Sequence, residues 1–385
     1  MSAEDDPARL RARPVPVSPD TPEAQVAPHA EVTPDDQGPG PAPAPAPIGT
    51  EAPEDGAVAR SATGGLPLWQ RVLTSPQFLV GVVIVLFVLY GATRSPEFLT
   101  VGTWINILRN AVFILIVASF TTFVFVSGGL DLSVGSLFAV GSIGTAGLLS
   151  AGWGIVPAVL AGCAAGAAAG WLNGVLINYA NIPAFITTLG MLYGARSLVV
   201  YFTGGQPISP VPDGFVKIAQ AELFGVPLLI LYAAAVALLA HVLLETTTFG
   251  WRVRAVGGNR EAANNAGINV RRVSTVVYTL SGLSAATAGM LMAARLGSGQ
   301  PSIGTGFELQ VISAVIIGGT SLFGGIGSIP GSVLGSLVLS ILATGLVLMR
   351  IDPVLQDFVV GVIIIVAVGL DQLRRRRMFR ATGQR

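Results

Sequence analysis

Long apolar runs recur between residues 77 and 372, separated by short polar or glycine-rich stretches, and they constrain the fold of this chain more than any other feature. A helix needs about 20 apolar residues to cross the hydrocarbon core of a membrane, and most of these runs reach that length. Hydrophobic residues make up 52% of the sequence and charged residues 11%. This composition predicts an all-α polytopic membrane protein with about ten transmembrane helices. The predicted helices are 77–93, 103–127, 132–150, 155–178, 183–203, 226–245, 273–296, 307–321, 329–349 and 354–372.

The N-terminal 65 residues differ in composition from the rest of the chain. They hold 11 of the 21 acidic residues and 13 of the 25 prolines. Such a segment has too little apolar surface to form a core, and it lacks the apolar stretch of a secretory signal peptide. The sequence therefore predicts a disordered cytoplasmic tail at 1–65, a transmembrane domain at 66–373 and a basic cytoplasmic C-terminus at 374–385.

The basic residues of the remaining chain are unevenly placed. Arg71, the polar stretch 246–272 and the C-terminal segment 374–385 together carry 12 of the 18 that follow the tail. Because cytoplasmic loops are enriched in lysine and arginine, these three regions are predicted to face the cytoplasm. Both termini then lie inside, which requires an even number of spans, and ten satisfies that requirement.

Two segments of the chain share a pattern. Residues 124–150 and 314–340 each combine the end of an apolar run, a glycine-rich polar turn and a helix rich in small residues. Transporters often place irregular backbone at corresponding positions of two related halves, so the pattern favours a duplicated architecture. The alternative is that glycine and serine are simply common in such helices. Glycines spaced by four at 162–174 predict close packing between helices.

The polar stretch 246–272 contains a predicted short helix. Asn259 is a good N-cap, Glu261 lies in the first turn where a carboxylate suits the helix dipole, and Gly267 is a natural C-terminal stop. A capped helix rimmed with arginine on the cytoplasmic side favours docking to another protein. The alternative is an ordinary cytoplasmic loop that obeys the charge rule.

Asp131 stands between two apolar runs, within the polar segment 128–136. An ionised carboxylate in hydrocarbon costs several kcal/mol, so this one is expected to face protein or water. It can contact a solute, or it can accept the free backbone N–H groups at the start of the following helix. The candidate residues for a polar path are Asp131, Ser133, Ser136, Thr187, Arg196 and Glu308.

Several chemistries have no support in the sequence. A phosphate-binding P-loop needs a lysine after a glycine-rich turn, and the only lysine, Lys217, has no such context. Any coupling to ATP must therefore come from a partner. Two histidines and one cysteine make a transition-metal site unexpected. No nucleophile–base pair is evident, so the chain is not expected to be an enzyme.

Four sequence segments resemble one known family. Residues 128–136 and 255–270 are similar to segments of the permease subunits of ribose-type ABC importers, the membrane subunits for ribose, xylose, galactose and related solutes. Residues 181–191 and 316–325 add further similarity. The resemblance covers residues 75–372 in sequence order, and the N-terminal tail lies outside it.

The resemblance implies a ten-helix permease in the cytoplasmic membrane that works as a dimer with a second copy. It implies that residues 250–270 sit in a groove of a cytoplasmic ATPase, which holds ATP and Mg²⁺, so that this chain itself needs no cofactor. The implied coupling residues are Gly250, Arg252, Arg254, Gly257, Asn259, Glu261 and Gly267.

An extracytoplasmic solute-binding protein is also implied, and it would deliver a sugar to the outer face. The cations expected there as partners for its acidic residues are Arg94, Lys217, Arg295 and Arg350, although each can equally be a solvated or snorkelling side chain. Membrane lipid is a further partner, and nucleic acid is not expected. The identity of the solute does not follow from the sequence.

A different class of transporter is the main alternative. An ion-coupled secondary carrier needs a carboxylate or histidine near the bilayer midplane, and Asp131 and His241 are both predicted near helix ends. A carrier working alone also has no use for a capped cytoplasmic helix. A passive channel is a third possibility, but no filter sequence is recognisable.

Overall fold

Helices form nearly all of the regular structure in the part of the chain that the computed structural model describes, residues 76–352, 355, 358, 361 and 362. All of these residues fall within one of the chain's two units, Thr63–Arg385. The helices are α2 (Pro76–Arg94), α3 (Val101–Val126), α4 (Val134–Ser150), α5 (Ile155–Asn178), α6 (Ala184–Thr203), α7 (Asp213–Gln220), α8 (Leu228–Glu245), α9 (Thr248–Gly258), α10 (Arg260–Asn265), α11 (Val270–Leu296), α12 (Phe307–Ile317) and α13 (Ile329–Leu348). A 3₁₀ turn (Pro96–Leu99) joins α2 to α3, and strands β1 (Glu222–Leu223) and β2 (Val226–Pro227) form an antiparallel hairpin.

Six helices of the described part are long and apolar enough to cross a membrane: α3, α5, α6, α8, α11 and α13. Three shorter apolar helices, Ile84–Arg94, Val134–Ser150 and Phe307–Ile317, occupy other predicted spans. Nine predicted ranges therefore coincide with apolar helices. The tenth, 354–372, lies almost wholly outside the described residues, as do the predicted tail 1–65 and the basic segment 374–385.

The predicted helix 307–321 is shorter in the structure. α12 ends at Ile317, and the chain then turns through Gly319, Gly324 and Gly325, which have φ angles of +86°, +88° and +77°. A right-handed helix cannot contain such angles, and only glycine adopts them without strain. The glycine-rich segment 318–328 is therefore an irregular connection between two helices.

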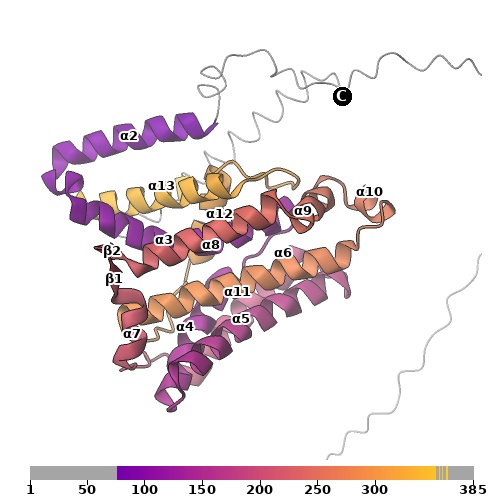
Figure 1. The fold of residues 1–385 in the computed structure, drawn as a ribbon, viewed down its shortest axis with the longest axis horizontal. Helices are drawn as coiled ribbons and strands as arrows, with labels where there is room; N and C mark the ends of the chain where they lie inside the picture. Colours follow the sequence, from indigo (N-terminus) through magenta and orange to yellow (C-terminus); the bar gives the residue numbers. More distant parts are fainter. Residues whose placement is uncertain (1–75, 353–354, 356–357, 359–360, 363–385) are drawn as a thin grey trace, which may run out of the picture. The chain divides into compact units, whose positions relative to one another are not determined.

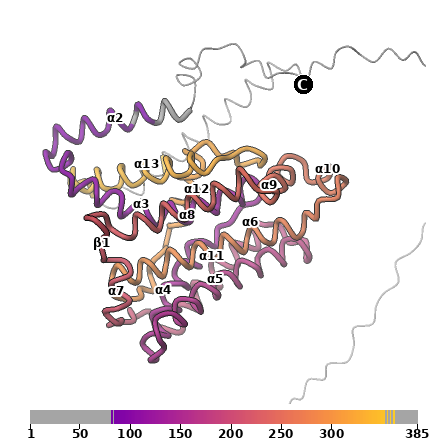
Figure 2. Tube along the Cα trace, viewed as in Figure 1, coloured from indigo at the N-terminus to yellow at the C-terminus, as the bar shows by residue number. Residues whose placement is uncertain are grey.

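The most extensive contact between two helices of the described part is the one between α5 and α11. These helices are antiparallel, and their traces run alongside each other in Figure 2. Glycines of α5 allow the two helix backbones to approach closely. A Cβ atom on Gly166 or Gly170 would collide with backbone of α11, and one on Gly174 would lie 2.7 Å from the Cα of Thr275. The predicted glycine stripe is thus a packing surface, because small residues let two helix backbones approach.

The two segments predicted as a repeat meet in space. α13 packs against α3, and the hydroxyls of Thr122 and Ser332 are 2.6 Å apart inside that contact. The backbone N–H of Gly325 donates to the carbonyl of Val126 at 2.9 Å. The glycine-rich connection after α3 and the one after α12 are therefore in direct contact.

Two groups of short elements lie at opposite ends of the helix bundle (Figure 1). At one end lie α7 and the β1–β2 hairpin, held by a hydrogen bond from the Gln220 amide to the carbonyl of Arg295 (3.2 Å). At the other end lie α9 and α10, held by a hydrogen bond from the Arg260 guanidinium to the Asn178 side chain (2.8 Å). The polar stretch 246–272 is thus concentrated at one end of the helices.

Candidate functional site

The C-terminal end of α9 packs closely against the glycine-rich connection after α3 and the one after α12. A Cβ atom on Gly257 would collide with the carbonyl of Val126, and it would lie 2.8 Å from the backbone nitrogen of Gly325. A Cβ atom on Gly324 would in turn lie 2.5 Å from the carbonyl of Gly257 and 3.1 Å from the Cα of Gly128. Three backbone segments therefore meet at one point without any side chain between them. We refer to this meeting point of residues 126–128, 257 and 324–325 as the glycine junction.

Local sequence builds α9 and α10 at this point. The hydroxyl of Thr247 accepts a hydrogen bond from the N–H of Gly250 and caps α9. The side chain of Asn259 accepts a hydrogen bond from the N–H of Ala262 at 2.9 Å and caps α10, as predicted. Gly267 has a φ angle of +82° and follows the end of α10.

α9 itself was not predicted from the sequence. It forms because Val253 and Val256 are buried in a cluster with Phe123 and Leu244, and because Phe249 stacks on Phe123 with ring centroids 6.1 Å apart. Residues three apart lie on one face of a helix, so the spacing of the two valines and the capping Thr247 were the sequence signals for α9. The three glycines among its eleven residues obscured these signals, because glycine disfavours helix.

The predicted coupling cations differ in what they contact. Arg254 forms an ion pair with Glu245 at 2.5 Å, and it therefore ties α9 to the end of α8. Arg252 and Glu261 are exposed, and the side chain of Trp251, which precedes Arg252, is 68% exposed. α9 and α10 thus carry exposed residues of mixed polarity. We call these residues the α9–α10 face and define it by Trp251, Arg252, Asn259, Glu261 and Asn264.

Asp131 is fully buried in a polar cluster. One of its carboxylate oxygens accepts from the backbone N–H (2.9 Å) and the hydroxyl (2.6 Å) of Ser133, and the other accepts from the Ser281 hydroxyl (2.8 Å). The Asn173 amide donates to Ser133 at 3.0 Å, and the Tyr278 hydroxyl donates to the carbonyl of Leu130 at 3.3 Å. The carboxylate therefore ties the segment before α4 to α11, and Ser133 ties the same segment to α5.

This cluster places Asp131 deeper than the sequence suggested. Ser281 lies close to the middle of the 27-residue helix α11, although Asp131 itself follows the end of α3. Asn173, Tyr278 and Ser281 were not predicted as its neighbours. No signal in the sequence identifies them, because the contacts join residues 40 to 150 positions apart.

Two further candidates for the path, Ser136 and Thr187, are buried. Ser136 donates to the carbonyl of Ser133 at 2.8 Å within the first turn of α4. The Thr187 hydroxyl, near the start of α6, has no hydrogen-bond partner among the described residues. Its neighbour Thr188 is satisfied by the carbonyl of Ala184 at 2.8 Å. Thr187 therefore retains an unused polar group inside the bundle.

Arg196 joins three segments of the chain. From α6 its guanidinium donates to the carbonyls of Pro301 (3.2 Å) and Ile303 (2.7 Å) and to that of Gly135 in α4 (3.3 Å). A Cβ atom on Gly135 would collide with the carboxylate of Glu308, whose Oε2 atom has no hydrogen-bond partner within the described part. The two predicted charged residues are thus brought to the same place, where α4, α6, α12 and the loop before α12 meet.

The four predicted outer cations do not form one cluster. Arg295 donates to the Asn110 side chain at 3.0 Å and Lys217 is exposed on α7. Arg94 and Arg350 line a separate polar cavity of about 520 Å³ between the ends of α2 and α13. α7, which carries Lys217, lies at the end of the bundle opposite α9 and α10 (Figure 1).

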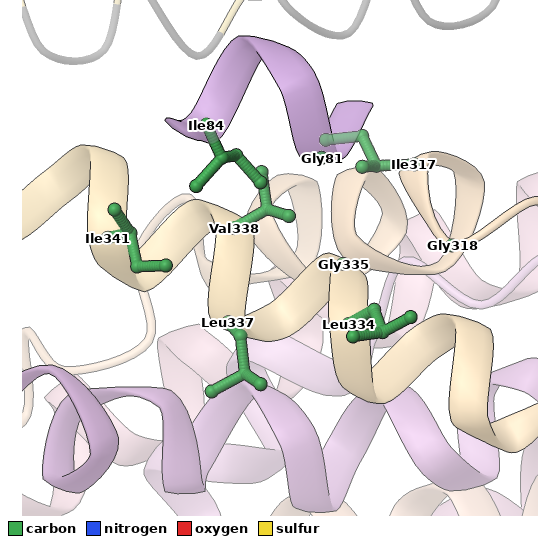
Figure 3. Close-up of a pocket in the computed structure, with 9 residues that line it drawn as sticks. All are labelled: Gly81, Ile84, Ile317, Gly318, Leu334, Gly335, Leu337, Val338 and Ile341. Atoms are coloured by element: carbon green, nitrogen blue, oxygen red, sulfur yellow. The ribbon is translucent and has the colours of Figure 1, made fainter. Parts of the chain in front are cut away.

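A cavity of about 190 Å³ lies between α2, α12 and α13, and Figure 3 shows Ile84 of α2 facing Val338 of α13 across it. Its remaining side chains are aliphatic and its glycines, Gly81, Gly318 and Gly335, contribute only backbone. Such a lining offers no side-chain partner for a hydroxyl group. Among the described residues, no group of three or more His, Cys, Asp or Glu side chains is placed to hold a metal ion.

Comparisons with known proteins identify the family of this chain. The family model described as "Branched-chain amino acid transport system / permease component" matches residues 103–368. The ribose import permease protein RbsC of Escherichia coli (strain K12) is 39% identical over 293 residues, which are 74% of this chain and 90% of that protein. The chain belongs to the ribose- and galactose-type family of ABC permeases.

Other relatives of this ABC permease support the same assignment. The ribose import permease protein RbsC of Bacillus subtilis (strain 168) is 37% identical over 72% of this chain and 87% of that protein. The galactose/methyl galactoside import permease protein MglC of Escherichia coli (strain K12) is 35% identical over 77% of this chain and 95% of that protein. No solved structure matches the sequence. The permease is a multi-pass protein of the inner membrane, and as a permease subunit it is not itself an enzyme.

Proposed function

We propose that this permease is the membrane-embedded subunit of an importer that moves a monosaccharide, or a similar small hydroxylated solute, with energy from a partner ATPase. The observation that carries the proposal is the glycine junction. Gly257 of α9 touches the backbone of both glycine-rich connections, while the α9–α10 face remains exposed. A partner that binds this face and moves α9 would act directly on both connections and on the helices that they join.

Close packing makes such a movement effective. Protein interiors are packed as densely as organic crystals, so a displaced backbone segment moves its neighbours rather than compressing them. Gly257 lies against Val126 and Gly325, which end α3 and precede α13 respectively. A shift of α9 by an ångström or two is within the range of known transitions at interfaces, and here it would be divided between these helices.

The proposed partners follow from this arrangement. A cytoplasmic ATPase, which would hold ATP and Mg²⁺, docks on the α9–α10 face, with Arg252 and Glu261 as its polar contacts. A solute-binding protein docks at the opposite end, where Lys217 and Arg295 offer positive charge and a cavity is lined by Arg94, Glu97 and Arg350. A second copy of the permease completes a homodimer. In this proposal the chain has ten spans with both termini in the cytoplasm.

The burial of unpaired polar atoms suggests which residues contact the solute. An unsatisfied buried oxygen costs about 1–3 kcal/mol, so it is expected to find a partner in a water or a ligand. Among the six residues predicted for the path, Thr187 and Glu308 carry such atoms, Oγ1 and Oε2 respectively. Asp131, Ser133 and Ser136 are satisfied by protein groups, so we assign them to positioning the path. Arg196 is assigned to holding the loop before α12.

The substrate class rests on the relatives. Proteins whose names specify ribose and galactose or methyl galactoside import are 34–39% identical to this chain. These solutes share several hydroxyl groups and carry no charge. The hydroxyl of Thr187 and the carboxylate of Glu308 are suited to hydrogen bonds with such groups, which can be donors and acceptors at once.

The depth of Asp131 supports a second candidate function, an ion-coupled secondary carrier of small polar solutes. Such a carrier needs a titratable group near the bilayer midplane, and Asp131 hydrogen-bonds to Ser281 in the middle of α11. The two functions separate in proteoliposomes that contain the permease, the ATPase and the binding protein. Uptake that requires ATP and both partners supports the importer, whereas uptake by the permease alone, driven by an ion gradient, overturns it.

The α9–α10 face gives the importer a sharper test. Arg252→Glu reverses an exposed charge that contacts no carboxylate in the described structure, so we expect it to reduce co-purification with the ATPase and solute-stimulated ATP hydrolysis severalfold. Arg254→Glu instead breaks the ion pair with Glu245. Combining it with Glu245→Arg restores that pair and is expected to recover assembly. Unchanged co-purification of the Arg252→Glu variant contradicts the proposed docking surface.

A further inference from the structure

A groove of about 360 Å³ lies between α5 and α11, at the end of the bundle where α5 stops and α11 begins. Trp171, Val175 and Tyr179 line it from α5 and its C-terminal cap, and α11 contributes Arg272, Thr275, Val276 and Thr279. Both helices are long and apolar enough to span the membrane. A groove between two such helices is accessible to the surrounding lipid.

The chemistry of the groove changes along its length. Arg272 lines its outer end, and Arg271 precedes Arg272 in the chain. Both arginines are exposed, and neither has a carboxylate partner among the described residues. The Arg271 guanidinium lies 5.7 Å from the centre of the Tyr179 ring. Tyr179 and Trp171 are each 54% exposed, as is typical of aromatic residues at a membrane surface. Val276 and Thr279 continue the groove along α11, away from the arginines.

The dimensions fit one amphiphilic molecule. Helical residues rise 1.5 Å each, so the lining from Trp171 to Tyr179 extends about 12 Å along the membrane normal. That length accommodates a headgroup and the first part of an acyl chain. Two adjacent cations require a negative charge at the headgroup, because basic pockets between transmembrane helices at the membrane surface attract anionic lipids.

We propose that this groove binds an anionic phospholipid, with its phosphate at Arg271 and Arg272 and one acyl chain between Trp171 and Val276. The site is separate from the solute path and from the α9–α10 face. It requires only that α5 and α11 span the membrane, and it does not depend on the importer mechanism. A bound lipid would link the ends of the two most closely packed helices.

Native mass spectrometry of the full-length permease in detergent tests this site, with phosphatidylglycerol and phosphatidylcholine as matched anionic and zwitterionic probes. We expect phosphatidylglycerol to be retained preferentially. The variant Arg271→Gln/Arg272→Gln is expected to lose that preference, with about tenfold weaker retention. Arg252→Gln, which removes another exposed arginine outside the groove, is expected to retain the lipid as the unmodified protein does.

A second variant probes the apolar part of the groove. Val276→Trp fills it and keeps both arginines, so retention of both lipids is expected to fall while the melting temperature stays the same. Glycerol 3-phosphate, which has the anionic phosphate without acyl chains, is expected not to compete. Equal retention of the two lipids, or competition by glycerol 3-phosphate, overturns the proposal. The proposal is also overturned if the double-glutamine variant keeps its lipid but changes from dimer to monomer. That result would show that the groove faces a second copy of the permease.

Discussion

At the scale of single residues, Asp131 shows how one carboxylate organises a buried segment. Its two oxygens accept three hydrogen bonds, two from Ser133 and one from Ser281. Hydrogen bonds to an ionised group are about twice as strong as those between neutral groups, so these contacts offset part of the cost of burial. The role is close to the predicted cap, but Ser133 rather than Asp131 occupies the N-cap position of α4.

Replacement of Asp131 distinguishes a positioning residue from a solute contact. Asp131→Ala leaves the hydroxyls of Ser133 and Ser281 without their acceptor, and we expect a loss of about 2–4 kcal/mol in unfolding free energy. Asp131→Asn keeps an acceptor of the same shape and is expected to insert normally and lose less stability. The measurement is the unfolding transition of the purified permease, together with its level in the membrane.

Ser281→Ala serves as the control for this prediction, because it removes only one of the three hydrogen bonds and leaves the carboxylate with Ser133. We expect it to cost about 1 kcal/mol. An Asp131→Ala variant that is as stable as the unmodified permease, but fails to transport, would show that the carboxylate contacts the solute instead.

At the scale of elements, the sequence predicts the apolar helices well and their connections poorly. Nine predicted spans coincide with helices because a run of about 20 apolar residues has few other stable conformations in a membrane. α9 was not predicted, since its stability comes from the burial of Val253 and Val256 against α3 and α8 rather than from helix propensity. Tertiary contacts likewise determine the position of Arg196 between three segments, which no local pattern specifies.

The two glycines at the end of α9 provide a matched pair for testing the glycine junction. Gly257→Ala places a methyl group against the carbonyl of Val126, and overpacking of this kind costs about 1–3 kcal/mol. Gly258→Ala meets no atom within 4 Å and changes helix propensity by the same amount. We therefore expect the Gly257 variant alone to lower the melting temperature and to reduce the transport obtained for each ATP hydrolysed.

Equal behaviour of the two alanine variants contradicts this prediction. If both are normal, the backbones at the junction separate without cost, and α9 does not transmit movement to α3 and α13. If both fail equally, the defect lies in the helix end common to them rather than in the contact that Gly257 makes with Val126 and Gly325.

At the scale of the whole molecule, the basic residues predict which end of the bundle faces the cytoplasm. The end that carries α9 and α10 has five arginines between residues 246 and 272, and the opposite end carries α7 and the β1–β2 hairpin (Figure 1). Arg71 and the six arginines of 374–385 lie outside the described residues, and by the charge rule they and the stretch 246–272 are predicted to share the cytoplasmic side. The same orientation places the α9–α10 face within reach of a soluble ATPase.

Labelling of single cysteines in intact cells measures this orientation directly. The only native cysteine, Cys163, is half-buried in α5, so Cys163→Ala provides the background. Glu261→Cys on α10 and Leu223→Cys on β1 both place a thiol at an exposed position. With a membrane-impermeant maleimide, Leu223→Cys is expected to react in intact cells, and Glu261→Cys only after the membrane is opened. The reverse pattern would place the α9–α10 face outside the cell, where no ATP-driven partner could act on it.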